Sequence, residues 1–305
     1  MLKKNIILIA LVLTTNASSF DYKLEPQEVS KDLWCFFGAL ESPSKENAGN
    51  IANSCYIKTK SNYVVFDSGP SYEYAAQSYE AMSKISKLPV LAVIASHEHD
   101  DHWLGNNFYK EKFNSELIGP STINENYKVG DKTRMFQVLP KSAIEGTKIV
   151  KLDTVVDKNI TRDFDGKVFE IIPIHTKAHT DKDIFVYLPS EKIILAGDLV
   201  MNGRITSNRH GSLLGQIKAI EMINKKDWDI IVNGHGLKYG KDGINEAWEY
   251  FTSMKKKVVK ALDDDVDLGD INKIVKMEKF QDKALFDELN AKNVAGAFTE
   301  LELLE

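Results

Sequence analysis

The sequence predicts a layered α/β (α+β) fold followed by a helical C-terminal extension, on three observations. Short apolar runs rich in β-branched residues, such as 62–67 and 88–96, recur through the first 240 residues. Stretches with helical periodicity alternate with these runs, at 71–87 and 212–225. Residues 241–305 are highly charged and helical in pattern, without an aromatic-rich strand.

Each half of this region has its own order of elements. In the first half, three strand-like runs precede the helix at 71–87, and a strand bounded by Pro89 precedes a helical stretch at 103–113. The strand-like runs are 31–40, 51–60 and 62–67. Residues 114–150 mix weak helix signals with turns. The second half contains six further strand-like runs and an Asp165-Gly166 turn, the runs being 149–156, 160–164, 167–174, 184–188, 192–196 and 228–234.

The first 17 residues have the layout of a secretory signal. Lys3 and Lys4 precede the apolar run 6–13, and small and polar residues ending at Ala17 follow it. We therefore expect a signal peptide at 1–17, a main domain at 18–240, an extension at 241–305, and export to the periplasm. The alternative is a buried N-terminal strand or helix. No other segment approaches transmembrane length, so we expect no stable membrane anchor after cleavage.

Composition excludes one class of partner and leaves a redox question open. The formal net charge is −5, and the basic run 255–257 is short, so the electrostatic footprint of a nucleic-acid-binding protein is missing. The two cysteines, Cys35 and Cys55, are too few for a thiolate metal cluster. If their strands are neighbours they can form a disulfide in an exported protein, and otherwise they are buried thiols.

Three of the seven histidines lie within six consecutive residues, directly after the strand at 88–96. Imidazoles this close would repel on protonation unless a cation keeps them neutral, so the segment predicts a metal site. In an extended loop His97 and His99 can reach one ion, while Asp101 and His102 turn toward a second. Glu98 and Asp100 are expected to point away.

Two ions need further ligands, and candidates stand at the ends of later strands. They are His179, Asp198 and His235, each within one or two residues of an apolar run. His175 competes with His179, because both histidines precede a threonine and follow the strand at 167–174.

The pattern His97-x-His99-x-Asp101-His102, with His179, Asp198 and His235 in order after it, resembles the metallo-β-lactamase superfamily over residues 31–240. Asp67-Ser68-Gly69 matches a turn common in that family. The resemblance implies an αββα sandwich in which His97, His99 and His179 hold one metal. Asp101, His102 and His235 would hold the other, and Asp198 would bridge both.

The resemblance also implies the chemistry of a hydrolase with two divalent metal ions, expected to be zinc. A metal-bound hydroxide would cleave an ester, thioester, lactone or amide bond of a small molecule, with Asp101 as a catalytic residue that orients the nucleophile. Well-known dizinc β-lactamases use a cysteine near the position of Asp198. Because both cysteines lie upstream here, the site is more similar to that of glyoxalase II, lactonases and related esterases.

Two loop residues and two other functions complete the predictions. Arg204 and His210 follow Asp198 near the expected mouth of the site, as substrate contacts or as solvated loop residues. One rival function is a mononuclear iron persulfide dioxygenase that uses His97, His179 and Asp198. The other is a non-catalytic periplasmic accessory protein. The runs 197–204 and 293–302 are also similar to the periplasmic quinoprotein relay system zinc metallohydrolases, and no protein partner is specified.

Overall fold

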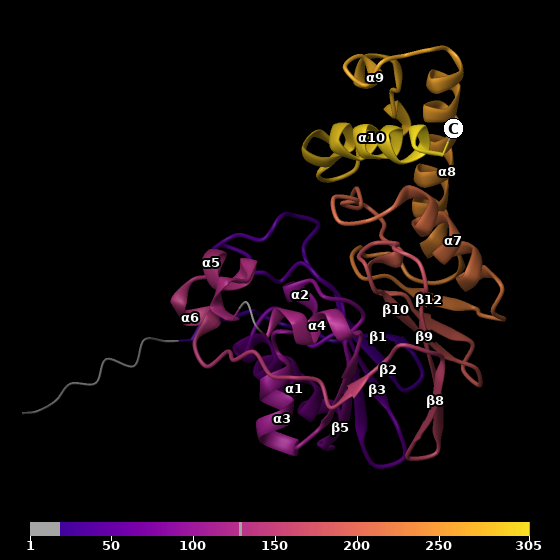
Figure 1. Cartoon of the computed structure of the whole chain (residues 1–305). Coiled ribbons are helices and arrows are strands. Elements are labelled where there is room, and N and C mark those ends of the chain that lie inside the picture. Colours follow the sequence, from indigo (N-terminus) through magenta and orange to yellow (C-terminus); the bar gives the residue numbers. More distant parts are fainter. Residues whose placement is uncertain (1–18, 128–129, 305) are drawn as a thin grey trace, which may run out of the picture.

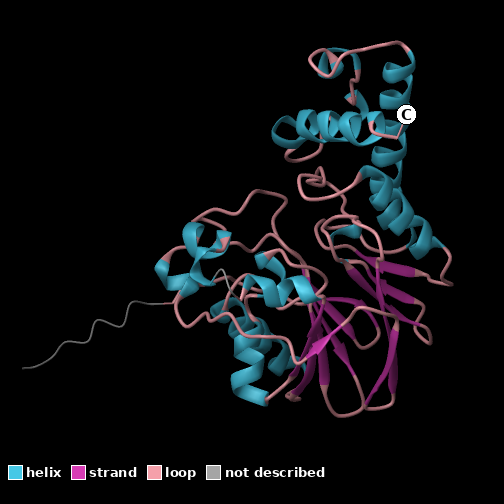
Figure 2. Ribbon diagram, in the orientation of Figure 1, coloured by secondary structure: helices cyan, strands magenta, loops and turns pink. Residues whose placement is uncertain are grey.

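Two β-sheets form the centre of the computed structural model, which describes residues 19–127 and 130–304 (Figure 2). The signal peptide predicted at 1–17 lies outside the described residues. The seven-stranded sheet has the order β1-β2-β3-β4-β5-β6-β7, and the five-stranded sheet has the order β12-β11-β10-β9-β8. The first sheet comprises β1 (Gln27–Ser30), β2 (Leu33–Phe36), β3 (Ser54–Lys58), β4 (Tyr63–Phe66), β5 (Val90–Ile94), β6 (Glu116–Gly119) and β7 (Thr154–Val155). The second comprises β8 (Ile160–Phe164), β9 (Lys167–Pro173), β10 (Ile184–Leu188), β11 (Ile193–Leu195) and β12 (Ile230–Val232).

Each sheet is antiparallel at one side and parallel at the other. Strands β1 to β4 pair antiparallel and β4 to β7 pair parallel. In the second sheet β8 to β11 are antiparallel and β12 joins β11 in parallel. The predicted turn between β8 and β9 is confirmed, because Asp165 and Gly166 both have positive φ, as a tight hairpin turn requires.

The apolar side chains between the two sheets form one shared core. Val64 and Ile94 of the first sheet belong to it together with Ile171, Val186 and Leu195 of the second. Strands such as β4 and β10 are buried along their whole length, because the other face of each sheet is covered by helices. This two-sided burial explains why these strands are continuously apolar in sequence.

Helices cover both outer faces and complete the αββα sandwich that the resemblance implied (Figure 1). Helices α1 (Tyr72–Ile85) and α3 (Asn106–Phe113) pack on the seven-stranded sheet, and α7 (Leu213–Asn224) and α8 (Asn245–Asp263) pack on the five-stranded one. The side chains of Ser71 and Ser212 cap the N-termini of α1 and α7. The remaining α-helices are α2 (Asp100–Trp103), α4 (Ser121–Asn126), α5 (Arg134–Val138), α6 (Lys141–Ile144), α9 (Ile271–Ile274) and α10 (Phe286–Glu302).

The C-terminal residues form a lobe that projects from the sandwich beside the five-stranded sheet (Figure 1). Between residues 241 and 304 the structure contains helices and turns but no named strand. Helix α10 packs against α8, and Phe251 of α8 and Phe298 of α10 share the core that covers the outer face of that sheet. No helix in the described part of the chain is long and apolar enough to cross a membrane.

Several strands differ from their predicted extents. The run 31–40 contains only β2, and the preceding strand β1 was not predicted because its residues are mostly exposed at a sheet edge. Strand β6 lies in the poorly predicted stretch 114–150, where its four residues are stabilised by parallel pairing with β5. The run 149–156 contributes only the two-residue strand β7.

The two cysteines form a disulfide between neighbouring strands of the seven-stranded sheet. Cys35 of β2 lies directly opposite Cys55 of β3, with Cα atoms 4.1 Å apart. Of the two alternatives left open by the sequence, the structure therefore has the disulfide.

Candidate metal centre

The loops at one edge of the sandwich bring all seven predicted ligands together. His97 and His99 follow β5, whereas Asp101 and His102 already belong to the short helix α2. Downstream, His179 lies between β9 and β10, Asp198 lies in the 3-10 turn Gly197–Leu199 after β11, and His235 follows β12. Strands far apart in sequence thus supply one site, as is usual at the ends of strands in layered folds.

Four of these residues form a first potential metal-binding group: His97, His99, His179 and Asp198. The Nδ1 atom of His99 lies 3.0 Å from Nε2 of His97 and 3.0 Å from Nε2 of His179. The Oδ2 atom of Asp198 is 3.5 Å from the His97 nitrogen and 3.2 Å from the His179 nitrogen.

The other three residues form a second group beside the first: Asp101, His102 and His235. The Nε2 atoms of His102 and His235 are 3.3 Å apart, and Asp101 Oδ2 is 3.7 Å and 3.5 Å from them. The carboxylate of Asp198 also reaches this group, with Oδ1 3.3 Å from His102 Nε2 and Oδ2 3.3 Å from His235 Nε2. Asp198 therefore lies between the two groups.

Hydrogen bonds alone do not account for this arrangement. A ring nitrogen such as His99 Nδ1 has either one proton or one lone pair, so it cannot satisfy two imidazole nitrogens at once. Asp198 Oδ1 is buried and has no hydrogen-bond partner among the described residues. Ligand nitrogens that surround a zinc ion tetrahedrally at 2.0–2.1 Å lie about 3.3 Å apart, close to the spacing found here. The residues present thus fit two divalent metal ions.

Asp67 fixes the orientation of two of the imidazoles. Its Oδ1 accepts a hydrogen bond from Ser96 N at 2.7 Å, and its Oδ2 lies 2.9 Å from Ser96 Oγ and 2.8 Å from His102 Nδ1. Since the carboxylate accepts the Ser96 hydroxyl proton, Ser96 Oγ in turn accepts from His97 Nδ1 at 2.9 Å. Both rings then have Nδ1 protonated, so the Nε2 lone pairs point into the site.

Two further contacts orient two of the three other candidate ligand histidines, His235 and His99. His235 Nδ1 lies 2.6 Å from the Ile51 carbonyl oxygen, which can only accept, so Nε2 of His235 is the free ligand atom. His99 Nε2 lies 3.3 Å from Nδ1 of His210, and His99 presents its Nδ1 to the cluster. His210 therefore contacts a ligand ring as well as facing the cavity.

The electrostatics of most of the candidate ligands favour the ionisation states that metal binding needs. His102 is the exception, because Asp198, Asp67 and Asp101 outweigh burial and raise its pKa well above the ordinary value. Burial lowers the pKa of His97 and of His99 well below the ordinary value, which keeps both imidazoles neutral. Burial alone would raise the pKa of Asp198, but the surrounding imidazoles hold it well below its usual range. Asp101 is likewise held ionised, because Arg134 and His102 outweigh the effect of burial and lower its pKa.

Arg134, which no sequence pattern singled out, supports the second group. Its Nη2 donates to Asp101 Oδ1 at 2.6 Å and to Asp100 Oδ1 at 3.2 Å. Asp100 also accepts the backbone N–H of Met135 at 2.7 Å, and it belongs to neither ligand group, as expected. Arg134 lies in the stretch 114–150 whose pattern was weakest, and no local signal links it to Asp101.

A cavity of about 620 Å³ opens onto the metal-binding groups. Ser42 and Pro43 of the loop between β2 and β3 form part of its wall, as do Arg204 and His210. His175 is exposed and belongs to neither ligand group, so of the two competing histidines only His179 is in the cluster.

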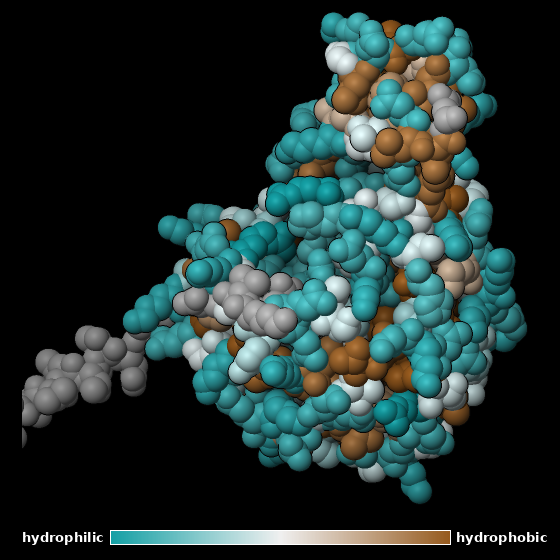
Figure 3. All heavy atoms as spheres, viewed as in Figure 1, coloured by the Kyte–Doolittle hydropathy of each residue, from teal (hydrophilic) through white to brown (hydrophobic). Residues whose placement is uncertain are grey.

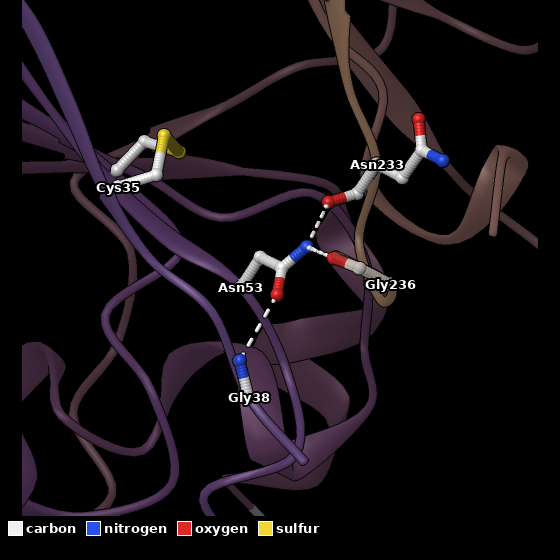
Figure 4. The surroundings of a disulfide bond; sticks show 6 residues. Cys35, Gly38, Asn53, Asn233 and Gly236 are labelled. Atoms are coloured by element: carbon white, nitrogen blue, oxygen red, sulfur yellow. Dashed lines mark hydrogen bonds between the residues drawn. A yellow bond between two sulfur atoms is a disulfide. The ribbon is translucent and has the colours of Figure 1, made fainter. Parts of the chain in front are cut away.

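Asn53 ties the loop before β3 to the loop that contains His235 (Figure 4). Its side chain accepts from Gly38 N at 3.1 Å and donates to the carbonyl oxygens of Asn233 and Gly236, each at 2.9 Å. The disulfide between Cys35 and Cys55 lies nearby, on the strands β2 and β3 that flank these contacts. These contacts join the two sheets beside the second ligand group.

Comparisons with known proteins agree with this geometry. A family model described as the metallo-beta-lactamase superfamily matches residues 48–235, more than half of the chain. Metallo-beta-lactamase IND-1 from Chryseobacterium indologenes is 27% identical over 191 residues, covering 62% of this chain and 68% of that protein. The range of the family model includes all seven predicted ligands, from His97 to His235.

Solved structures show the same fold at low sequence identity. A metallo-beta-lactamase from Pontibacter korlensis superposes with a TM-score of 0.58 at 19% identity, over 75% of this chain and 99% of that one. The inverting sec-alkylsulfatase Pisa1 from Pseudomonas sp. has a TM-score of 0.66 at 15% identity, over 90% of this chain and 50% of the larger protein.

The family match, together with the two ligand groups at the edge of the sandwich, makes this chain a metal-dependent hydrolase. The family match makes the attribution specific: the chain belongs to the metallo-β-lactamase superfamily. Hydrolases of this superfamily act on small-molecule substrates.

Proposed function

We propose that this chain is a dinuclear zinc hydrolase that cleaves an ester, thioester, lactone or amide bond in a small molecule. The observation that supports this most strongly is the position of Asp198, whose two oxygens lie within 3.5 Å of ring nitrogens from both ligand groups. A carboxylate in that position fits a bridge between two cations.

The proposed ligands follow from the two groups. His97 Nε2, His99 Nδ1 and His179 Nε2 would hold the first ion, and Asp101, His102 and His235 the second, with Asp198 shared. When bound, two such ions polarise a carbonyl group and lower the pKa of water from 15.7 to about 7.

The residues of the chain orient the reactants. Arg134 holds Asp101 Oδ1, so Oδ2 faces the cluster, where it can accept a hydrogen bond from the attacking water and align it. Hydrolysis adds the water oxygen to the acyl carbon and breaks the bond to the leaving oxygen, sulfur or nitrogen, which takes up the proton. No protein nucleophile is required, and the described residues near the cluster include no free cysteine.

The completeness of the second group favours the hydrolase over the iron dioxygenase. A mononuclear site built from His97, His179 and Asp198 needs no further ligands, yet Asp101, His102 and His235 are buried with their ligand atoms in reach of one another. Arg134 and Asp67 are moreover positioned to orient that second group.

We also propose that the protein is exported to the periplasm. The layout of residues 1–17 supports this, and so does the disulfide, since such bonds persist in oxidising compartments.

The experiment is a pair of matched histidine substitutions together with Asp198→Ala. His179→Ala and Asp198→Ala should lose bound zinc and all hydrolysis of a panel of esters, thioesters, lactones and a β-lactam. His175→Ala, the same change on an exposed histidine a few residues away, should retain both. Full metal content and activity in Asp198→Ala, or equal losses in the two histidine variants, would overturn the assignment.

A further inference from the structure

The connection between β7 and β8 contains an acceptor motif for N-linked glycosylation. Asn159-Ile160-Thr161 has the pattern of an asparagine followed, after one residue other than proline, by serine or threonine. The sequence has this pattern at one other place, at Asn16 within the predicted signal peptide. Once the signal is cleaved after Ala17, Asn159 is the acceptor asparagine that remains in residues 18–305.

A carboxylate precedes the motif at a fixed spacing. Asp157 lies two residues before Asn159, with Lys158 between them. Bacterial oligosaccharyltransferases recognise an acidic residue in this position together with the asparagine and the hydroxyl residue. The segment from Asp157 to Thr161 therefore carries all three groups that such an enzyme binds.

The folded chain presents these groups to solvent. Asp157 and Lys158 form an exposed bend after β7, and Asn159 directly precedes β8. Asn159 is exposed, and its side-chain amide has no hydrogen-bond partner among the described residues. Thr161 is exposed as well, whereas Ile160 between them is half-buried. Because side chains alternate along a strand, Asn159 and Thr161 both face away from the core.

The backbone of the segment is also accessible, because β8 is an edge strand. It pairs with β9 on one side, where Ile160 lies opposite Ile171 and Thr161 opposite Glu170. No strand in the described part of the chain pairs with its other side. Figure 1 shows β8 as the strand of its sheet that lies farthest from the C-terminal lobe. An open edge can pair with another chain unless something covers it.

The segment lies away from the reacting centre. None of the residues 157–161, all of which the structure describes, lines the cavity above the metal-binding groups. They also belong to neither ligand group. A bulky group attached to Asn159 would therefore leave the metal centre open to its substrate.

We propose that Asn159 is an N-glycosylation site, modified by an oligosaccharyltransferase that uses a lipid-linked oligosaccharide. Nδ2 of Asn159 forms a bond to the anomeric carbon of the first sugar, and the bond from that carbon to the lipid pyrophosphate breaks. The amide gives up one proton, and the lipid pyrophosphate leaves with the electron pair of the broken bond. Asp157 and Thr161 are the recognition residues, and the attached glycan, which is bulky and hydrophilic, covers the open edge of β8. This inference rests on the proposed export, since the transfer takes place in the periplasm.

The test expresses the full chain together with a bacterial oligosaccharyltransferase and its lipid-linked glycan, in a bacterial host that lacks both. Intact-mass measurement of the periplasmic protein should show the mature chain with one glycan added, and peptide mass spectrometry should locate the glycan on Asn159. Asn159→Gln, Thr161→Val and Asp157→Ala should each abolish the added mass, whereas Thr161→Ser, which retains the hydroxyl group, should keep it. Asn272→Gln, the same change on an exposed asparagine outside the pattern, should also keep it.

A second arm separates this proposal from the proposed export. Residues 1–17 are replaced by a signal peptide of the host, so that delivery to the periplasm no longer depends on them, and an established acceptor protein is expressed beside the chain to report transferase activity. If the glycan is added only in this arm, the predicted export fails and the acceptor site stands. If the acceptor protein is glycosylated while the periplasmic chain is not, or if Asn159→Gln retains the glycan, the proposal is overturned.

Discussion

Replacing Asp67 by asparagine should weaken metal binding although Asp67 is not itself a ligand. The residue lies in the turn after β4, is fully buried and has a φ of 57°. Asparagine has nearly the same shape and tolerates this left-handed conformation, so the backbone need not move. What changes is one oxygen, which becomes an N–H₂ group.

Either orientation of the new amide places a donor against a donor. If the amide nitrogen takes the Oδ2 position, it faces His102 Nδ1 and Ser96 Oγ, which now lie 2.8 Å and 2.9 Å from the oxygen. His102 must then accept at Nδ1, and its proton moves to Nε2, the ligand atom. If the nitrogen takes the Oδ1 position, it faces the backbone N–H of Ser96.

The size of the effect follows from these contacts. Leaving one buried donor unsatisfied costs about 1–3 kcal/mol of folding stability. Loss of the partner that orients a ligating imidazole typically weakens metal affinity or activity by roughly 10–100-fold. We expect both effects, with the weaker binding at the ion held by His102.

The assay is competition for zinc between the protein and a chromophoric chelator, with thermal unfolding measured in parallel. Val186→Ala is the control, because this residue of β10 lies in the core between the two sheets and its truncation should cost about 2 kcal/mol without changing zinc affinity. If Asp67→Asn binds zinc as tightly as wild type, Asp67 does not orient His102 in the way described.

Three further predictions concern a glycine beside the metal centre, the disulfide and the pH dependence of stability. Gly234→Ala should abolish zinc binding, since a Cβ there would lie 2.0 Å from Asp198 Oδ1. Gly296→Ala in α10 is the control: its Cβ meets nothing within 4 Å, so thermal melts should show a helix stabilised by up to about 1 kcal/mol and zinc content should not change. Reducing the disulfide, or replacing Cys35 and Cys55 by alanine, should cost about 3 kcal/mol in urea unfolding, and no loss would show that the cross-link is dispensable. The metal-free chain should become less stable as the pH drops below about 6.5. Burial lowers the pKa of His97, His99 and His235 in the folded chain, so in this range the unfolded chain binds more protons than the folded one. A melting temperature that stays constant during an acid titration would contradict this.

The seven candidate ligands selected from the sequence lie together in the structure, and several of them lie close to strand ends. A strand end fixes where the next residue lies, and His97, Asp198 and His235 each come within a few residues of one. The fold class followed from the same alternation of short apolar runs and helical stretches.

The supporting residues could not be predicted in the same way. Arg134 and Asp67 approach the ligands through tertiary packing, and a single arginine or aspartate in a sequence carries no sign of its partner. Helix α10 was recognised as a helix, but its place in the cavity wall depends on how Ala284 pairs with Arg204. Strands β6 and β7 were missed or overextended because neighbours, more than their own residues, stabilise them.

Hydrophobic side chains are visible on the surface of the C-terminal lobe, whereas most of the surface in the same view is hydrophilic (Figure 3). Leu268, Ile274 and Leu303 are among the exposed apolar residues there. Truncating the chain at 240 would expose the much larger apolar face that α8 and α10 cover, so the extension is expected to be needed for folding.

Metal stoichiometry tests the central claim most directly. The metal-free chain is dialysed to equilibrium against zinc, and elemental analysis is combined with hydrolysis of the ester panel. Two zinc ions per chain, with activity that rises as the second ion binds, is the predicted result. One iron ion per chain with oxygen uptake on a persulfide would contradict it, as would a chain that binds two zinc ions and cleaves none of the bonds tested.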